Sequence, residues 1–128
     1  SVVAIMAQRL VRVVCQKCKQ PYIPSDSLLQ SVGITPEVAA KATFMRGKGC
    51  GHCQGTGFRG RIALFELMLM SSRLRELTFQ GAPTAQLRRA AISEGMKTLF
   101  QDGISKAMKG ITTIEEVLRV AKPSEDDV

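Results

Sequence analysis

The sequence predicts a mainly α-helical fold with a small β component, in which a cysteine-knuckle subdomain is followed by a bundle-like helical part. Three observations carry this prediction: two Cys-x-x-Cys pairs, one apolar run at 61–70, and a series of capped helix patterns after residue 71. With 128 residues, 45% of them hydrophobic, the chain is long enough for one domain with a core and a small stapled appendage.

The four cysteines form two knuckles, each with two residues between its sulfurs. Two such knuckles supply the tetrahedral four-sulfur shell that zinc accepts in closed structural sites, so we expect one zinc ion on Cys15, Cys18, Cys50 and Cys53. Two disulfide bonds are the weaker interpretation, because no secretion signal precedes the pairs. An iron–sulfur cluster ordinarily uses other spacings. His52, the only histidine, is interpreted as a spacer because four cysteines already complete the shell.

The segment before the first knuckle is predicted to be helical. Four apolar residues recur there with the spacing of one helix face: Val3, Ala7, Leu10 and Val14. Residues 1–14 are therefore assigned to a helix that continues from an upstream part of the protein. The chain opens on Ser1 instead of Met, and we expect it to be a piece of a longer protein.

Residues 15–62 are assigned to the tetracysteine zinc-binding subdomain, which has a helical insert between its knuckles. Ser25 or Asp26 is placed to cap a short helix that runs to about Val32. The run Thr35-Pro36-Glu37 is typical of a helix start, with a cap, a proline at the first position and an acid in the first turn. Residues 43–46 are expected to be extended and to return the chain to the metal.

Residues 63–122 are assigned to a strand and a helical C-terminal part, and residues 123–128 to a disordered acidic tail. The stretch Arg61 to Met70 is apolar on both faces, which predicts a central strand. Four helices are then expected to begin at or near Ser72, Pro83-Thr84, Thr98 and Thr113. Thr113 with Glu116 matches a capping box.

The composition restricts the classes of partner. The chain carries a net charge of +7, but its cations occur in no run of four, so each pair is interpreted as part of a solvated basic surface. Aromatic residues make up only 5% of the chain, too few for a platform that stacks single-stranded nucleic acid. The N-terminus lacks the layout of a signal peptide, and no apolar run approaches the roughly 20 residues that span a bilayer.

The sequence contains no motif for catalysis. It has no G-x-x-x-x-G-K-[ST] phosphate loop, and a single histidine inside a knuckle leaves no Ser-His-Asp or Cys-His arrangement. A four-cysteine shell has no open position for a catalytic water. Glu66 is expected to have a structural role, for example in an ion pair with Arg59 or Arg61. We therefore predict no catalytic residue and no enzymatic activity for this stretch by itself.

A set of motifs in fixed order resembles a known family. The motifs are Ala7-Gln8-Arg9-Leu10 ahead of the first knuckle, Gly49-Cys50-x-x-Cys53-x-Gly55-x-Gly57-Phe58-x-Gly60-Arg61, Phe65-Glu66-Leu67, Glu94-Gly95-Met96-Lys97-Thr98-Leu99, and Gly110-Ile111-Thr112-Thr113-x-Glu115-Glu116-Val117. From about residue 4 to residue 120, the chain resembles the C-terminal region of the secretion-superfamily motor ATPases that serve bacterial type II secretion and type IV pilus assembly.

The resemblance implies a larger machine around this region. It implies a homohexameric ATP hydrolase on the cytoplasmic side of the inner membrane, peripherally associated with it, that couples ATP hydrolysis to an inner-membrane platform protein. It places ATP and magnesium in an upstream core and makes this region a zinc-stabilised coupling module. The cysteine pairs favour the secretion or pilus assembly branch over retraction motors, and the resemblance does not separate secretion from pilus assembly.

Two questions stay open at this point. Arg59 and Arg61, at the start of the predicted strand, are candidates to reach a neighbouring nucleotide site, and an ion pair to Glu66 or plain solvation explains them equally well. A zinc-ribbon module that binds nucleic acid is the alternative function, supported by the charge and the knuckles alone. The scattered charge, the scarce aromatics and the motif order favour the motor module, for which no nucleic acid is expected.

Overall fold

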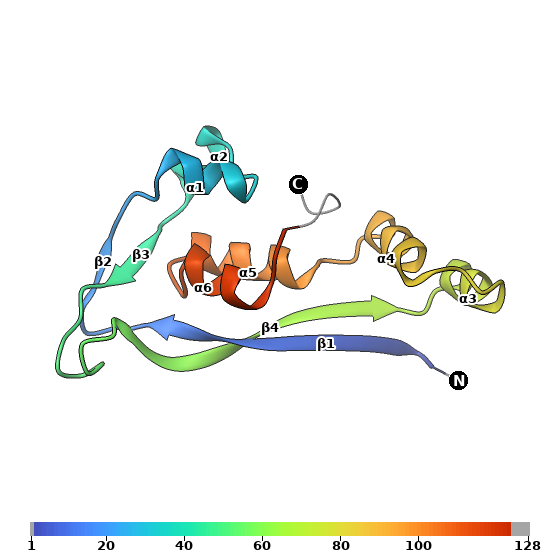
Figure 1. Cartoon of the computed structure of the whole chain (residues 1–128), viewed down its shortest axis with the longest axis horizontal. Helices are drawn as coiled ribbons and strands as arrows, with labels where there is room; N and C mark the ends of the chain where they lie inside the picture. The colour runs from blue at the N-terminus through green and yellow to red at the C-terminus, as the bar shows by residue number, and fades with distance from the viewer. Residues whose placement is uncertain (1, 124–128) are drawn as a thin grey trace.

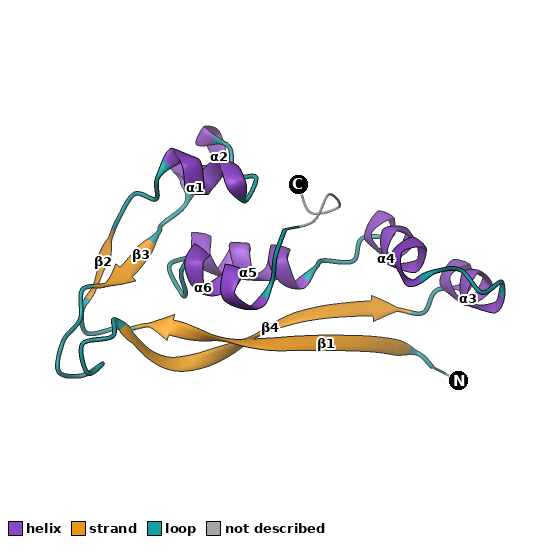
Figure 2. Cartoon of the chain, in the orientation of Figure 1, coloured by secondary structure: helices purple, strands orange, loops and turns teal. Residues whose placement is uncertain are grey.

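The computed structural model describes residues 2–123, so the acidic tail expected at 123–128 lies almost wholly outside the described residues. Within that range the chain is mainly α-helical with a small β component, as predicted (Figures 1 and 2). The elements are β1 (Ala4–Val14), β2 (Lys19–Pro21), α1 (Asp26–Ser31), α2 (Pro36–Lys41), β3 (Met45–Gly47), β4 (Phe58–Leu69), α3 (Ser72–Phe79), α4 (Thr84–Ser93), α5 (Leu99–Met108) and α6 (Ile114–Val120). No helix in the described range has the length and hydrophobicity that crossing a bilayer requires.

The predicted helix over residues 1–14 is wrong, because this segment is strand β1. It pairs antiparallel with β4 from Ala4 opposite Leu69 to Val14 opposite Phe58, with one irregularity near the knuckle. On a helix Leu10 would share a buried face with Val14, but its side chain is 43% exposed. The segment is rich in β-branched residues, which fit a pleated surface, and the long pairing with β4 overrides an apolar spacing that two structures can share.

Strand β4 confirms the predicted extended segment but not its central position. Among the described residues β4 pairs only with β1, which makes a two-stranded ribbon with helices along one side (Figure 1). Leu64 is fully buried beneath the helices, whereas Phe65, Leu67 and Leu69 are exposed. The prediction of a central strand, which was based on apolar residues on both faces, is therefore wrong for the described residues: β4 has a neighbouring strand on one edge only.

The insert between the knuckles has the predicted short helices. Ser25 caps α1 by accepting from the Leu28 N–H, and Thr35 caps α2 in the same way, with Pro36 at the first helical position. Strands β2 and β3 form a small antiparallel ribbon that joins these helices to the cysteines. The extended segment expected at 43–46 overlaps β3 at residues 45 and 46 only.

The C-terminal helices begin where the capping signals predict, with one difference. Thr98 and Gln101 form a complete capping box at α5. At α6, Thr113 accepts from the Glu116 N–H, but the Glu116 carboxylate does not return to the cap. It bonds the backbone and side chain of Arg12 on β1 instead, so the predicted capping box is only half formed.

The helices bury two separate hydrophobic clusters. The larger cluster joins the insert to α5 and α6; its buried members are Leu29, Val32, Ile34, Phe44, Phe100, Ile104, Ala107, Ile114 and Val117. The smaller cluster lies between α3, α4 and the end of β4; its buried members are Leu74, Ala90 and Ala91. The larger cluster crosses the boundary placed at residues 62 and 63, so the segment that contains the cysteines and the last two helices share one core.

Candidate metal centre

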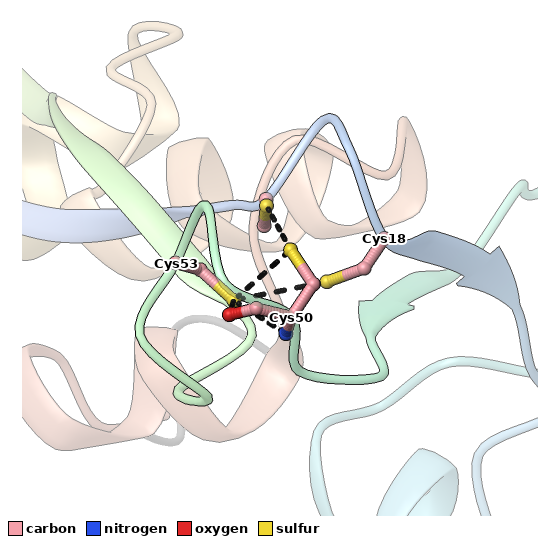
Figure 3. A group of neighbouring side chains, drawn as sticks. Cys18, Cys50 and Cys53 are labelled. Carbon is pink, nitrogen blue, oxygen red and sulfur yellow. Dashed lines mark hydrogen bonds between the residues drawn. The ribbon is translucent and has the colours of Figure 1, made fainter.

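The two knuckles lie where the two ribbons meet. Cys15 follows β1 directly, Cys18 precedes β2, and Cys50 and Cys53 lie between β3 and β4. The four sulfur atoms all lie within 4.8 Å of one another, so the structure brings together every predicted ligand (Figure 3). No histidine or carboxylate joins this group in the described part of the chain, and His52 is an exposed spacer.

The spacing between the sulfurs suits a tetrahedral ion. The Sγ atoms of Cys15 and Cys50 are 3.9 Å apart, and those of Cys18 and Cys53, and of Cys50 and Cys53, are 3.8 Å apart. A tetrahedron with Zn–S bonds of about 2.3 Å has edges of about 3.8 Å. The side chains of Cys15 and Cys53 are buried and those of the other two are half-buried, which closes the shell to solvent on one side.

Backbone amides already point at the sulfurs. The Gly49 N–H donates to Cys18 Sγ, and the N–H groups of Cys50 and Gly57 donate to Cys53 Sγ, each at 3.2 Å. These donors stabilise negative charge on sulfur, which a thiolate ligand needs before it binds a metal. The backbone around Cys18 and Cys53 therefore favours thiolates at these two positions.

Two glycines allow this frame to close. A Cβ atom at Gly57 would lie 2.6 Å from the Gly47 carbonyl oxygen, and Gly57 has a φ of +82°. Only glycine tolerates both the left-handed backbone and the close approach of β3 to the start of β4. This contact explains the glycine at position 57.

The thiols of Cys18 and Cys53 differ in their pKa values in the metal-free structure. Burial raises the pKa of the Cys18 thiol to about 11. Burial also raises the pKa of Cys53, but hydrogen bonds from the Cys50 and Gly57 N–H groups outweigh it and lower that pKa to about 6. Cys53 is therefore the first of these two ligands to become a thiolate, and metal binding must release a proton from Cys18 at neutral pH.

The two arginines singled out in the sequence do not meet at one site. Arg59 donates from Nη1 to the His52 carbonyl oxygen at 2.8 Å, which ties the start of β4 to the second knuckle. Arg61 is exposed and lies opposite Arg12 in the ribbon. The ion pair expected between Glu66 and one of them is absent, because Glu66 bonds Arg88 at 2.7 Å instead.

Sequence reasoning missed one buried polar cluster. Glu116 is 3% exposed and accepts hydrogen bonds from Arg12 and Arg119, with the Arg12 N–H at 2.7 Å and Arg119 Nε at 2.8 Å. Thr112 donates to the Arg12 carbonyl oxygen beside it. The cluster fastens α6 to β1, and the motif around Thr112 to Val117 was its only signal in the sequence.

Comparison with known proteins relates the whole chain to one family. A family model described as "Type II/IV secretion system protein" matches residues 1–119. The chain is 38% identical over 118 residues to "Type IV pilus assembly ATPase PilB" of Thermus thermophilus, covering 92% of this chain and 13% of that protein. It is 38% identical over 122 residues to "Type II secretion system protein E" of Pseudomonas aeruginosa, covering 95% of this chain and 24% of that protein. It is 35% identical over 127 residues to "Type II secretion system ATPase E" of Vibrio cholerae, covering 97% of this chain and 24% of that protein. The chain thus spans a quarter or less of the length of each of these relatives.

Proposed function

Because the chain belongs to the type II/IV secretion system protein family, we propose that it is the zinc-binding C-terminal module of a motor ATPase that powers type II secretion or type IV pilus assembly. The four-sulfur cluster carries the zinc assignment, since Cys15, Cys18, Cys50 and Cys53 have the donor type and the spacing of a closed structural site. Backbone N–H groups also donate to two of the sulfurs, those of Cys18 and Cys53. Both kinds of relative, secretion and pilus assembly, match at similar identity, so the proposal covers both.

The metal acts here through position. A zinc ion would be held by Cys15 and Cys18 between β1 and β2 and by Cys50 and Cys53 between β3 and β4, and it would have no free position for a substrate. Bound there, it fixes the β1–β4 ribbon to the β2–β3 ribbon and so to the insert. The larger hydrophobic cluster continues that connection to α5 and α6. The two ribbons, the insert, α5 and α6 therefore form one connected body, which is what a coupling element between a catalytic core and a partner needs.

The whole protein is proposed to be a homohexameric ATP hydrolase that binds ATP and magnesium upstream of this region. It works on the cytoplasmic side of the inner membrane, peripherally attached, and drives the inner-membrane platform of the secretion or pilus machinery. Support comes from the names of the relatives, several of which are called ATPases of secretion or pilus assembly. This region by itself is proposed to lack ATPase activity.

Arg59 and Arg61 are proposed to lie near a nucleotide site of the assembled protein. Both are exposed at the start of β4, and neither forms an ion pair within residues 2–123. The Arg61→Gln variant of the full-length protein tests this role, with Arg89→Gln as a control on the exposed face of α4. We expect Arg61→Gln alone to raise the KM for ATP, and equal KM values in both variants would contradict the role.

The nucleic-acid-binding alternative has less support. The aromatic rings nearest the knuckles are already covered, since the guanidinium of Arg12 lies 4.2 Å over Phe58 and that of Arg46 lies 5.4 Å over Tyr22. A mobility shift with duplex DNA or RNA that weakens steeply with salt would favour this alternative over the motor module.

The zinc assignment is tested on the chain itself. We expect elemental analysis to find one zinc ion per chain in the parent protein. In the double variant Cys50→Ser/Cys53→Ser we expect it to find no zinc. A matched variant, Ser72→Ala, leaves the ligands intact and should keep the ion. A purified chain without metal and with an unchanged melting curve after chelation would overturn the assignment.

The coupling role is tested in the full-length protein. With Cys50 and Cys53 changed to Ser, we expect ATPase activity and hexamer assembly to survive while secretion or pilus assembly fails. Normal export by this variant would show that the metal does not matter for coupling. Loss of ATPase activity and assembly would show that the module is needed for the catalytic core to fold.

A further inference from the structure

The insert between the two knuckles carries an apolar groove, here called the insert groove, that the metal centre does not use. It has a volume of about 640 Å³ and is lined by α1, α2, the turn between them and Ile23. Two of its lining residues, Leu29 and Ile34, are buried members of the larger hydrophobic cluster. Figure 1 shows both helices standing apart from the β1–β4 ribbon, beyond β2 and β3. An occupant of the groove would therefore rest on the larger cluster and stay clear of the ribbon.

Ile23, which precedes α1, forms one wall of the insert groove. It is 92% exposed, more than any other large apolar residue in the described part of the chain. A second groove of about 220 Å³ shares Ile23, Leu29 and Ala39 with the first, so apolar surface continues on both sides of this side chain. Contiguous apolar surface of this kind is typical of a binding site, because covering it removes apolar area from water.

The charge at the insert groove is opposite in sign to the charge around it. Residues 1–62 contain nine lysines and arginines but only two carboxylates, Asp26 and Glu37, and both lie in the insert. Asp26 is the one charged residue among those described as lining the groove. It is exposed and forms no ion pair within residues 2–123. Charge complementarity therefore favours an occupant that carries a cation beside its apolar side chains.

The shape of the insert groove favours a helical occupant. None of the residues that line it belongs to a strand, so it offers no open backbone edge to which an extended segment could add. The Thr35 hydroxyl already accepts from the Val38 N–H, which leaves Asp26 and Gln30 as the polar side chains for a ligand. A small polar molecule would call for more converging polar groups. An amphipathic helix needs only an apolar groove with a suitable charge at its edge.

We propose that the insert groove binds a basic amphipathic helix from a cytoplasmic segment of the inner-membrane platform, an inference that rests on the proposed motor function. Cytoplasmic segments next to membrane-spanning helices carry an excess of lysine and arginine. The apolar face of such a helix covers Ile23 and the groove, and one of its cations pairs with Asp26. Because the groove is built on the larger cluster, docking here connects the platform to α5 and α6.

A synthetic helix tests the proposed chemistry on the whole chain loaded with zinc. The probe is a short fluorescent peptide of leucine and lysine, with all its leucines on one helical face, and its counterpart carries glutamate in place of lysine. We expect the lysine peptide to bind saturably and to shift the NMR signals of α1, α2 and Ile23. Overall charge cannot produce this binding, because the chain itself has a net charge of +7. The glutamate peptide should leave these signals nearly unchanged.

Matched variants separate the groove from the rest of the insert. Ile23→Ser removes the exposed wall and should weaken binding of the lysine peptide about tenfold. Its control, Val38→Ser, removes an exposed apolar side chain of α2 that does not line the groove, and should bind as the parent does. Asp26→Asn should weaken binding about two- to fivefold at low salt. Its control, Glu37→Gln, removes the other carboxylate of the insert and should bind nearly as the parent does.

The remaining outcomes identify other occupants. Equal losses in Ile23→Ser and Val38→Ser would overturn the groove as the binding site. A preference of the groove for the glutamate peptide would overturn the basic occupant. A dimer of the chain that Ile23→Ser dissociates would make a second copy the occupant. Protection of the groove amides from exchange in the full-length protein without its partners would show that another segment of the same protein covers the groove.

The platform itself is tested in cells that produce the full-length protein. A photo-reactive residue in place of Ile23 should crosslink to the platform protein, and the same residue in place of Val38 should not. Ile23→Ser should lower export, and normal export by this variant would overturn the platform as the occupant. Zinc content is measured for every purified variant. A metal-loaded chain that binds neither peptide overturns this inference alone, whereas a chain without metal overturns the proposed zinc module instead.

Discussion

The larger hydrophobic cluster draws side chains from residues 22–121, whereas the smaller cluster is built from residues 68–96. The larger cluster needs the metal end, the insert and the last two helices to be in place together. The smaller one needs only two consecutive helices and the end of one strand. This difference predicts two levels of stability in one chain, a long-range body that depends on the cysteines and a local helical pair that does not.

Removal of the metal should separate the two regions most sharply. Structural zinc of this kind contributes on the order of 10–16 kcal/mol, so chelation or Cys50→Ser/Cys53→Ser should unfold the insert together with α5 and α6. Amides in α3 and α4 should keep part of their protection in residue-resolved hydrogen exchange. Because α5 and α6 share the larger cluster with the insert, only α3 and α4 are expected to stay folded without the metal. Full protection of α1 and α5 in the metal-free chain would contradict the comparison.

One large side chain in each cluster tests the same difference at smaller scale. Phe100 is 3% exposed, and Phe100→Ala should cost about 3–5 kcal/mol of unfolding free energy across the larger body. Leu74 is 1% exposed, and Leu74→Ala should cost about 2–5 kcal/mol, confined to α3 and α4. Denaturant unfolding followed by NMR distinguishes the two patterns. A loss below about 1 kcal/mol at Phe100 would show that the larger cluster does not carry the stability.

Glu116 gives the larger body a dependence of its stability on pH. Burial raises the pKa of Glu116, but hydrogen bonds from Arg119 and Arg12 outweigh it and lower the pKa from 4.5 to about 2. Because the folded pKa is depressed, this stabilisation is complete above about pH 4.5 and is lost as pH falls toward 2. Glu116→Gln should cost about 1–3 kcal/mol at neutral pH and flatten the acid limb of a stability–pH curve. If the acid limb of the curve were unchanged in Glu116→Gln, Glu116 would not be a source of the loss of stability at low pH.

Gly103 tests how closely the larger cluster is packed. A Cβ atom there would lie 2.5 Å from Val117 Cγ1, so Gly103→Ala should cost about 1–3 kcal/mol despite the better helix propensity of alanine. The double variant Gly103→Ala/Val117→Ala makes room for the added methyl group. Thermal melts should show less than additive destabilisation in the double variant, and strict additivity would mean that the two residues do not touch.

The smallest expected effect compares one helix cap from each region. Ser71 caps α3 and Thr113 caps α6, each through a side-chain oxygen that accepts from a backbone N–H. Ser71→Ala and Thr113→Ala should each cost about 1 kcal/mol. The loss at Ser71 should appear only in exchange from α3 and α4, while the loss at Thr113 should appear across the larger body. If both variants showed the same pattern of hydrogen exchange, the two regions would be one cooperative folding unit.

Local signals made the helices and the candidate site predictable. Helix caps such as Thr35, Thr98 and Thr113 bond a backbone N–H three residues further along the chain. A Cys-x-x-Cys pair places its two sulfurs close together through its spacing alone. Both features can therefore be predicted without knowing how the rest of the chain folds. The segment 4–14 was misassigned because an apolar spacing of three and four residues fits a helix and also a strand that is buried at only a few positions. Its partner β4 lies some fifty residues away, and no local pattern identifies such a partner.

The buried polar contacts were unpredictable for the same reason. Glu66 was expected to pair with Arg59 or Arg61, close in sequence, but it pairs with Arg88 from α4. Glu116 was assigned to a capping box because it lies three residues after Thr113. Its carboxylate instead forms an ion pair with Arg12, which is far away in the chain. Sequence spacing predicts contacts inside a turn of helix and is silent about contacts that depend on how the ribbon and helices pack.

The cysteines also bear on the order in which the chain folds. Strands β1 and β4 form one long hairpin, but residues 15–57 stand where a hairpin normally has a short turn. Closing a flexible loop of that length costs about 3 kcal/mol of chain entropy before any strand pair forms. An ion that joins the two knuckles would close this loop first. The pairing of β1 with β4 could then begin next to the cysteines and proceed along the strands as in an ordinary hairpin, which lowers the effective contact order of the pairing. A metal ion bound by the cysteines would thus take the place of a β-turn, and the refolding rate of this chain should then rise with the concentration of free zinc.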